Sequence, residues 1–268
     1  MVLGYLTDKL VLRPSRNPIP AVGKQRRMVP FGRSQVEVWC QRFGPSSAAT
    51  TTGLPDLYVF KLGGVGSRAE RQTGHPLDFW TDLSADVWAM NPPGYGGSSG
   101  RASLKTWIVA AQVVFEYLQA QAGDRPILIT GNSLGTASAL FLAARHEIAG
   151  LILRNPIPLG LLIAGHYGGW SLGLGSRAIA AQVPAAFDSI RNASSCTCPA
   201  IFVTCNQDSV APPSYQHPIR EAYGGPLRYL LLPDADHASL LQPHELAGYR
   251  ELLEWLKTET LPVRSSQT

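Results

Sequence analysis

The stretch Pro126-Ile127-Leu128-Ile129-Thr130-Gly131-Asn132-Ser133-Leu134-Gly135 decides the fold of this chain. A short apolar run ends in the pattern Gly-x-Ser-x-Gly, and residues 136–144, rich in alanine and leucine, follow it. The first run predicts a buried strand and the second a helix. Between a strand and a helix, this pattern forms a sharp turn in which side chains larger than glycine would collide with either element. We therefore predict that Ser133 stands at the carboxyl end of a sheet, above the positive end of a helix.

Strand and helix patterns alternate along most of the chain. Further strands are predicted from apolar or alternating runs at 57–62, 85–90, 150–155, 200–205 and 227–232, and a half-exposed edge strand at 35–43. Helices are predicted over 104–122, 214–223 and 244–260, together with a shorter one that ends near Leu83. This order favours an α/β fold, with a mostly parallel central sheet and helices on both of its faces. Active sites of such sheets gather at the carboxyl ends of the strands.

The predicted domain organisation is a single α/β domain over residues 35–268, preceded by an extended arm at 1–34 that is rich in Pro and Arg. A short apolar insert at about 156–195 follows the strand that ends at Asn155. It is too short for a full helical lid, so we expect a minimal cap and an open site. Its apolar side chains either form an acyl-chain groove or pack on the sheet; they are Leu159, Leu161, Leu162, Ile163, Tyr167, Trp170, Leu172 and Leu174.

Composition and charge exclude several classes of protein. Hydrophobic residues make up 45% and charged residues 16% of the chain, which is typical of a folded domain rather than a disordered one. The formal charge of +4 is small, and its one basic cluster, residues 24–27, is interpreted as a solvated loop, so we expect no nucleic-acid partner. Residues 157–175 are long enough to span a bilayer, but Pro158, His166 and several glycines make a poor lipid-facing helix. We expect no integral membrane span and at most transient contact with a membrane.

The cysteines and the amino terminus bear on the compartment. Cys40, Cys196, Cys198 and Cys205 do not have the spacing of a zinc site, so we expect no metal. Cys40 and Cys205 lie in strand-like runs, where buried, reduced thiols are expected. Residues 1–9 lack the basic and apolar regions of a secretory signal. Together these features favour the reducing cytoplasm.

A serine needs a base to act as a nucleophile, and that base is oriented by a carboxylate. Asp208 follows the strand predicted at 200–205, and His237 follows the strand predicted at 227–232. The chain order Ser133, Asp208, His237 is the order expected of a serine hydrolase with this alternating fold. Asp234 and Asp236 are alternative acids, although their closeness in sequence to His237 makes the required side-chain geometry unfavourable.

With these residues in place, the chain resembles the α/β-hydrolase superfamily over about residues 35–260. It is similar to the minimally capped group that includes protein depalmitoylases and monoacylglycerol lipases. The resemblance implies a nucleophilic serine, an acyl-enzyme formed and hydrolysed in two steps, and no cofactor. It rests on Gly63-Gly64, Asn91-Pro92-Pro93-Gly94-Tyr95-Gly96, Gly131-Asn132-Ser133-Leu134-Gly135, Asp208 and His237.

The resemblance also implies an oxyanion hole made of backbone N–H groups. We assign these donors to Leu134 and Gly64, with Val65 as the fallback. Family members often carry His-Gly on this second loop, where the present chain has Leu62-Gly63, so the loop must be braced in another way.

The predicted activity is hydrolysis of carboxylic esters or thioesters, with an acyl chain or another small ester as substrate. For the pocket we predict Tyr167, Trp170 and Leu162. A peptidase or an acyltransferase would use the same triad, and a binding protein without activity would share the fold. The sequence leaves these alternatives open, as it does the natural substrate and the oligomeric state.

Overall fold

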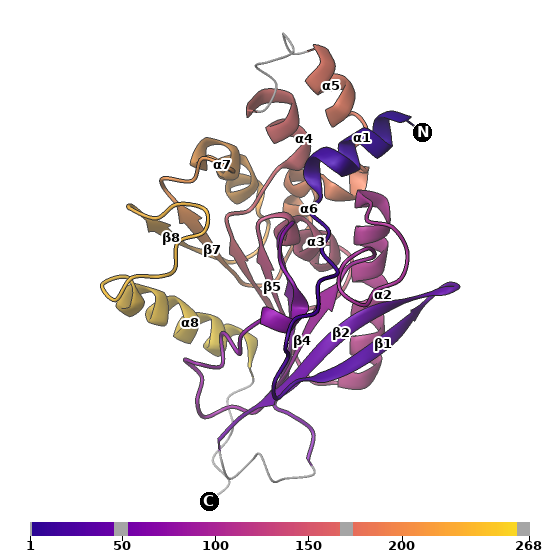
Figure 1. Cartoon of the computed structure of the whole chain (residues 1–268). Coiled ribbons are helices and arrows are strands. Elements are labelled where there is room, and N and C mark those ends of the chain that lie inside the picture. The colour runs from indigo at the N-terminus through magenta and orange to yellow at the C-terminus, as the bar shows by residue number, and fades with distance from the viewer. Residues whose placement is uncertain (1, 46–52, 167–173, 262–268) are drawn as a thin grey trace, which may run out of the picture.

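The computed structural model describes residues 2–45, 53–166 and 174–261. Its centre is an eight-stranded sheet in the order β1-β2-β4-β3-β5-β6-β7-β8 (Figure 1). The strands β3 to β8 run parallel, and the β1–β2 and β2–β4 pairs are antiparallel. The strands are β1 (Gln25–Phe31), β2 (Ser34–Phe43), β3 (Leu57–Leu62), β4 (Ala85–Asn91), β5 (Ile127–Asn132), β6 (Gly150–Arg154), β7 (Ala200–Cys205) and β8 (Leu227–Leu232).

Helices cover both faces of this sheet, which confirms the predicted fold class (Figure 1). On one face pack α2 and α3, with Trp107, Phe115 and Leu140 in the core. On the other face packs α8, with Leu253 and Leu256. The longer helices are α1 (Val2–Val11), α2 (Leu104–Ala122), α3 (Leu134–Ala143), α5 (Leu174–Ala180), α6 (Ser189–Ser194), α7 (Pro213–Ala222) and α8 (Leu246–Thr260). The shorter helical segments are η1 (Ala69–Arg71), α4 (Leu159–Leu161), the π-helical η2 (Leu162–His166) and η4 (Ala185–Phe187).

Local sequence signals explain where α2 begins and ends. Ser103 precedes α2, and its hydroxyl accepts a hydrogen bond from the N–H of Thr106, as an N-cap serine does. Gly123 follows the last residue with a φ of 57°, a conformation that ends helices at low cost only in glycine. The apolar stripe between these two signals faces the core, so α2 begins and ends where the pattern predicted.

Three predictions of secondary structure are wrong. Residues 1–34 are not an extended arm, because they contain α1 and β1. Since β1 pairs with β2 along its whole length, β2 is an inner strand and β1 is the edge. The helix expected to end near Leu83 does not form: Gly74 and Pro76 interrupt it, and Leu77, Trp80 and Leu83 reach the core from turns instead.

The amino-terminal helix and the insert lie together beside the sheet, and we call α1, α4, η2 and α5 the cap (Figure 1). Thr7 of α1 donates from its hydroxyl to the carbonyl of Ile179 in α5, at 3.3 Å. Asp8 accepts a hydrogen bond from the N–H of Leu104, the first residue of α2, at 2.8 Å. Segments from opposite parts of the sequence are thus joined over the carboxyl ends of the strands.

All four cysteines are free, and Cys40, Cys196 and Cys205 are buried, as expected for Cys40 and Cys205. Across the parts of the chain that the structure describes, no helix has both the length and the apolar character that crossing a bilayer requires.

Candidate active site

The turn between β5 and α3 holds Ser133 in an uncommon backbone conformation, with φ 52° and ψ −122°. A positive φ is strained for a residue other than glycine and persists only when its surroundings enforce it. Here the N–H of Ser133 donates to the carbonyl of Arg154 at 3.0 Å. Its own carbonyl accepts from the hydroxyl of Thr136 at 2.6 Å and from the N–H of Thr136 at 2.9 Å. Both peptide groups of the serine are therefore fixed by neighbouring elements.

The two glycines of the pattern are required by close approach of the backbone. A Cβ atom on Gly131 would lie 2.8 Å from the Cα of Thr136. A Cβ atom on Gly135 would overlap the carbonyl group of Leu62 at the end of β3. The glycines thus allow α3 to approach β5 and the loop after β3, as the strand–turn–helix interpretation requires.

The structure brings Ser133, His237 and Asp208 together from three different strand ends. Nε2 of His237 lies 3.1 Å from Oγ of Ser133, and Nδ1 lies 2.6 Å from Oδ2 of Asp208. The Asp208 side chain is fully buried, and its other oxygen accepts from the N–H groups of Val210 and Ala211 at 2.8 and 2.7 Å. A carboxylate held in this way presents one oxygen to the imidazole and cannot turn away from it.

The alternative acids point elsewhere. Asp236 is exposed and accepts hydrogen bonds from the hydroxyl and N–H of Ser239 and from the N–H of Ala238. These hydrogen bonds, that of the Ser239 hydroxyl first, lower the pKa of Asp236 below its usual value. Asp234 is exposed as well. Among the three candidate acids it is therefore Asp208 that contacts the histidine.

Asn155 is a site residue that the sequence interpretation missed. It is fully buried, has a φ of 48°, and follows the last residue of β6. Its amide nitrogen donates to the carbonyl of His237 at 3.3 Å, and its amide oxygen accepts from the N–H of Cys205 at 3.0 Å. Arg154 donates to the carbonyl of Ser239 on the same loop. The available signal was an asparagine as the last residue of a predicted strand, because asparagine adopts positive φ more readily than most residues.

The loop after β3 lies against the serine turn. An added Cβ on Gly64 would lie 3.1 Å from the Cβ of Ser133, so this loop and the turn are in contact. The N–H of Gly64 donates to Oγ of Ser67 at 3.0 Å, while the N–H of Ser67 donates to the carbonyl of Gly64, also at 3.0 Å. The N–H of Gly64, which the sequence analysis assigned to the oxyanion hole, is therefore already hydrogen-bonded in this state. Leu134 begins α3, so its N–H has no carbonyl partner one turn earlier within the helix.

A buried arginine and a buried tyrosine brace this loop. Arg68 is 4% exposed and donates to the carbonyls of Ser15 and Asn17, both at 3.0 Å. The hydroxyl of Tyr95 donates to the carbonyl of Val65 at 2.8 Å. The same hydroxyl accepts from the backbone N–H of Arg13 at 3.0 Å. The amino-terminal segment therefore helps to hold the loop that faces Ser133.

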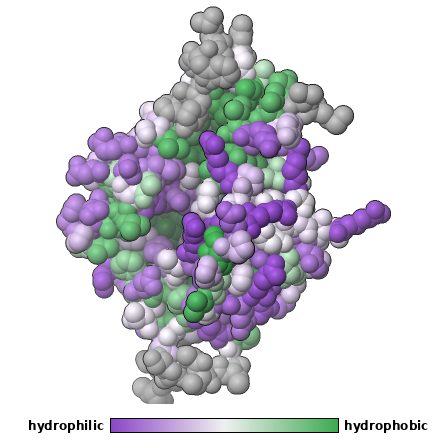
Figure 2. Space-filling model, in the orientation of Figure 1, coloured by the Kyte–Doolittle hydropathy of each residue, from purple (hydrophilic) through white to green (hydrophobic). Residues whose placement is uncertain are grey.

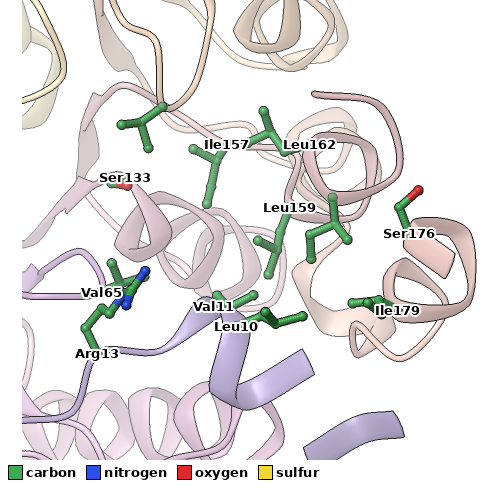
Figure 3. A pocket seen from close by; sticks show the side chains of 12 residues that line it. Leu10, Val11, Arg13, Val65, Ser133, Ile157, Leu159, Leu162, Ser176 and Ile179 are labelled. Carbon is green, nitrogen blue, oxygen red and sulfur yellow. The ribbon is translucent and has the colours of Figure 1, made fainter. Parts of the chain in front are cut away.

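A cavity of about 440 Å³ opens from Ser133 toward the cap (Figure 3). Its volume lies within the range of roughly 300–1,000 Å³ that is usual for small-molecule sites. Leu162, predicted for the pocket, lines it, whereas Tyr167 and Trp170 lie outside the described residues. The contribution of α1 was not foreseen, because the sequence interpretation treated that segment as extended. The main apolar lining residues are Leu10, Val11, Ile157, Leu159, Leu162 and Ile179.

No metal site accompanies these groups in the described part of the chain, where no three His, Cys, Asp or Glu side chains are placed to share an ion. The polar side chains that line the cavity are those of Arg13, Ser133 and Ser176, and the imidazole of His237 contacts the hydroxyl of Ser133. Such an arrangement can remove a proton from a hydroxyl and return it to a departing group.

Comparison with known proteins bears on the fold and the family of this chain. The family model described as alpha/beta hydrolase fold matches residues 74–167. Alpha/beta hydrolase domain-containing protein 17B of Xenopus laevis is 33% identical over 84 residues, which are 31% of this chain and 29% of that relative. An uncharacterized protein of Mycobacterium tuberculosis is 27% identical over 85% of this chain and 79% of its own. A Pyrococcus furiosus esterase structure has a TM-score of 0.67 at 13% identity, covering 93% of this chain and 97% of the esterase, and shares the fold.

Proposed function

We propose that this chain, which belongs to the α/β-hydrolase superfamily, is a serine hydrolase that cleaves carboxylic esters or thioesters of acyl chains. One observation carries the proposal: the continuous hydrogen-bonded path from Asp208 through His237 to Ser133, at 2.6 and 3.1 Å. A nucleophile within hydrogen-bond reach of a base, and a base oriented by a third group, is the arrangement that activates a hydroxyl.

In the proposed mechanism His237 takes the proton of Ser133 while the serine oxygen attacks the acyl carbonyl. His237 then gives this proton to the departing alcohol or thiol, and the acyl group stays on Ser133. Water enters, loses a proton to His237 and releases the acid in a second step of the same kind. Asp208 keeps the imidazole in the required tautomer and stabilises its charged form throughout.

For the oxyanion we propose the N–H groups of Leu134 and Gly64, with Val65 as the fallback. The hydroxyl of Ser67 now accepts from Gly64, but it is a neutral acceptor. A negatively charged oxygen accepts a stronger hydrogen bond, so an oxyanion displaces the hydroxyl. One such donor typically contributes about 3 kcal/mol to transition-state stabilisation.

For the acyl chain we propose the apolar cavity between the insert and α1. Leu159, Leu162 and Ile179 lie on the side of Ser133 that faces the cap (Figure 3). Burial of each CH₂ group there contributes up to about 0.8 kcal/mol, so kcat/KM is expected to rise with chain length until the cavity is filled. This assigns the insert to substrate binding as well as to packing, since Leu159 and Leu162 are also buried.

The proposal is tested with a fluorophosphonate probe and a panel of p-nitrophenyl esters from C2 to C12, extended to matched thioesters and amides. Labelling of Ser133, located by mass spectrometry, and turnover that disappears in Ser133→Ala are the expected results. Ser138→Ala is the control, because Ser138 lies on α3 in the same core and its hydroxyl has no hydrogen-bond partner among the described residues. Turnover by folded Ser133→Ala would refute the mechanism.

The same panel separates the alternatives. A binding protein would neither label nor turn over any substrate. A peptidase would cleave the amides, and an acyltransferase would pass the acyl group to an added alcohol faster than to water. A steep preference for the acetyl ester would count against the acyl cavity while leaving the triad in place.

As a setting we propose the cytoplasm, on the support of four free thiols, three of them buried. We propose only transient contact with membranes, through the exposed side chains of Leu3, Leu6 and Leu161 on the cap. Co-sedimentation with neutral phospholipid vesicles tests this contact. Binding that persists after Leu3 and Leu6 are both changed to Ser would contradict it.

A further inference from the structure

A second cavity, of about 430 Å³, adjoins the other face of α1. Tyr5, Asp8 and Lys9 line it from the helix, and their spacing places them on one helical face; Leu12, directly after the helix, lines it as well. Leu10 and Val11, which line the cavity of Ser133, lie on another face of the same helix. The carboxyl end of α1 thus stands between an apolar cavity and a second one of different character.

The second cavity is basic. Its lining holds four cationic side chains and one carboxylate: Lys9, Arg13, Arg16 and Arg101, with Asp8. Asp8 accepts from the N–H of Leu104 and lies 3.5 Å from Arg101, so it offsets one cation at most. The remaining positive charge has no acidic partner among the lining residues.

Arg16 shows how this charge is held in place. Its guanidinium donates to the carbonyls of Gly94, Ser98 and Gly100, at 3.4, 3.1 and 2.8 Å. Carbonyl groups orient the side chain without neutralising it. Lys9 and Arg101 lie over the ring of Tyr5, at 5.7 and 4.6 Å from its centroid, so several cations gather beside this fixed one. Such a cluster suits a ligand group that carries more than one negative charge.

Arg13 joins the two cavities, because it lines both. It is the one cationic side chain among the described residues that line the cavity of Ser133. Its backbone is tied through the Tyr95 hydroxyl to the carbonyl of Val65, on the loop that faces the serine. Its guanidinium is exposed and has no hydrogen bond or ion pair with other described residues, and Figure 3 shows the side chain at the edge of the cavity of Ser133.

From this arrangement we propose that the leaving group of the natural substrate carries a phosphate, which binds at Arg13 and the basic cavity. The inference rests on the proposed function and deepens it. The aliphatic chain and the anion need different surroundings, and the two cavities provide them. The apolar cavity takes the acyl chain, so the phosphate belongs to the alcohol or thiol part of the substrate.

The reaction leaves the phosphate untouched. The serine oxygen forms a bond to the acyl carbon, the bond from that carbon to the leaving oxygen or sulfur breaks, and His237 protonates the leaving atom. Hydrolysis of the acyl-enzyme then yields a fatty acid and a phosphorylated alcohol or thiol. No oxidant, metal or second substrate besides water enters the balance.

The test uses two substrates that differ in one phosphate, 1-octanoylglycerol 3-phosphate and 1-octanoylglycerol, each below its aggregation concentration. Wild-type enzyme is expected to prefer the phosphate ester in kcat/KM by tenfold or more, roughly what charge-assisted hydrogen bonds provide. Arg13→Gln is expected to bring this ratio close to one, because Arg13 lines both cavities, and Lys9→Gln to lower it by about two- to threefold, because Lys9 lines only the basic cavity and an exposed charge contributes little by itself. The ratio does not depend on the fraction of enzyme that is folded.

The control is Arg33→Gln, since Arg33 is an exposed arginine in the turn between β1 and β2 and lines neither cavity. Its ratio should equal that of the wild type. As a readout without turnover, glycerol 3-phosphate should inhibit hydrolysis of p-nitrophenyl octanoate competitively, and glycerol should not.

Two results overturn the inference. The first is a wild-type ratio of one or below in an enzyme that hydrolyses p-nitrophenyl octanoate, which leaves the proposed function standing. The second is a high ratio that Arg13→Gln does not change. A chain that hydrolyses none of these esters and does not react with fluorophosphonate refutes both the inference and the proposed function.

Discussion

The glycines of the serine turn and two glycines of the cap, Gly4 and Gly160, differ in the space around them. Gly131 and Gly135 touch backbone atoms of neighbouring elements, so neither can hold a side chain. A Cβ atom on Gly160 of α4 would meet nothing within 4 Å, and one on Gly4 of α1 only a side-chain oxygen at 3.9 Å. The proposed chemistry therefore lies where backbones are in contact, and the proposed substrate selection lies where a side chain has room to change.

The helices of the two regions show the same contrast. All ten residues of α3, below Ser133, are buried. By comparison, Leu3, Leu6 and Leu10 of α1 are 45%, 45% and 57% exposed. In the space-filling view hydrophobic side chains gather at the end of the molecule where α1, α4 and α5 lie (Figure 2). A helix held by a few contacts can change in sequence without disturbing the sheet, which separates selectivity from stability.

The largest effect is expected from a substitution at the serine turn, where a glycine has no room for a side chain. Gly135→Ala forces a methyl group against the carbonyl of Leu62, so α3 and the loop after β3 must separate. We expect kcat/KM for p-nitrophenyl octanoate to fall at least about 100-fold, as misplacement by about 1 Å does. Overpacking should also lower the free energy of unfolding by about 1–3 kcal/mol. Gly160→Ala is the matched control, and a loss of similar size there would remove the distinction between the two regions.

The next effect concerns the histidine loop. Asn155→Ala removes the hydrogen bonds to His237 and Cys205 while Ser133, His237 and Asp208 remain. We expect kcat to fall by about 10- to 100-fold with little change in KM, because a base must be held within hydrogen-bond reach of its proton. Asn192→Ala, at a buried asparagine of α6, should destabilise the chain but leave kcat unchanged. Equal kcat values in the two variants would show that Asn155 has only a structural role.

The contrast also explains which features could be predicted from sequence. The strand, turn and helix over residues 126–144 could be predicted from local sequence, since the apolar run, the glycines and the helical pattern are contiguous. Asp208 and His237 were found because each follows a strand, and parallel strands bring their carboxyl ends to one edge. Asn155 and Arg13 were missed, because their partners lie 82 residues away at His237 and Tyr95, and no local period signals them. The cap was predicted only in part, because α1 packs against α5, which lies about 170 residues later in the sequence.

A smaller effect is expected inside the cap. Leu162→Ala removes apolar contact from the cavity and should lower the ratio of kcat/KM for octanoyl over acetyl esters by about five- to tenfold, which is the transfer energy of between about one and two CH₂ groups. The neighbouring Leu161 is 51% exposed and does not line the cavity, so Leu161→Ala should keep the wild-type ratio. If both variants have the same ratio, the acyl chain does not lie against η2.

The smallest effect separates the two candidate donors on the loop after β3. Ser67→Ala removes the acceptor that now occupies the N–H of Gly64, while the hydrogen bond from the N–H of Ser67 to the carbonyl of Gly64 is retained. If Gly64 serves the oxyanion, kcat/KM stays the same or rises by up to about threefold, because a neutral hydroxyl is a weak competitor of an anion. If Val65 is the donor, the hydroxyl only braces the loop, and its loss should lower kcat by more than about tenfold through a misplaced donor. Measuring the Ser67→Ala variant with esters of increasing chain length completes the comparison. A change confined to the loop after β3 must alter kcat/KM for every ester by the same factor, whereas a change that reaches the cap alters kcat/KM more for long esters than for short ones.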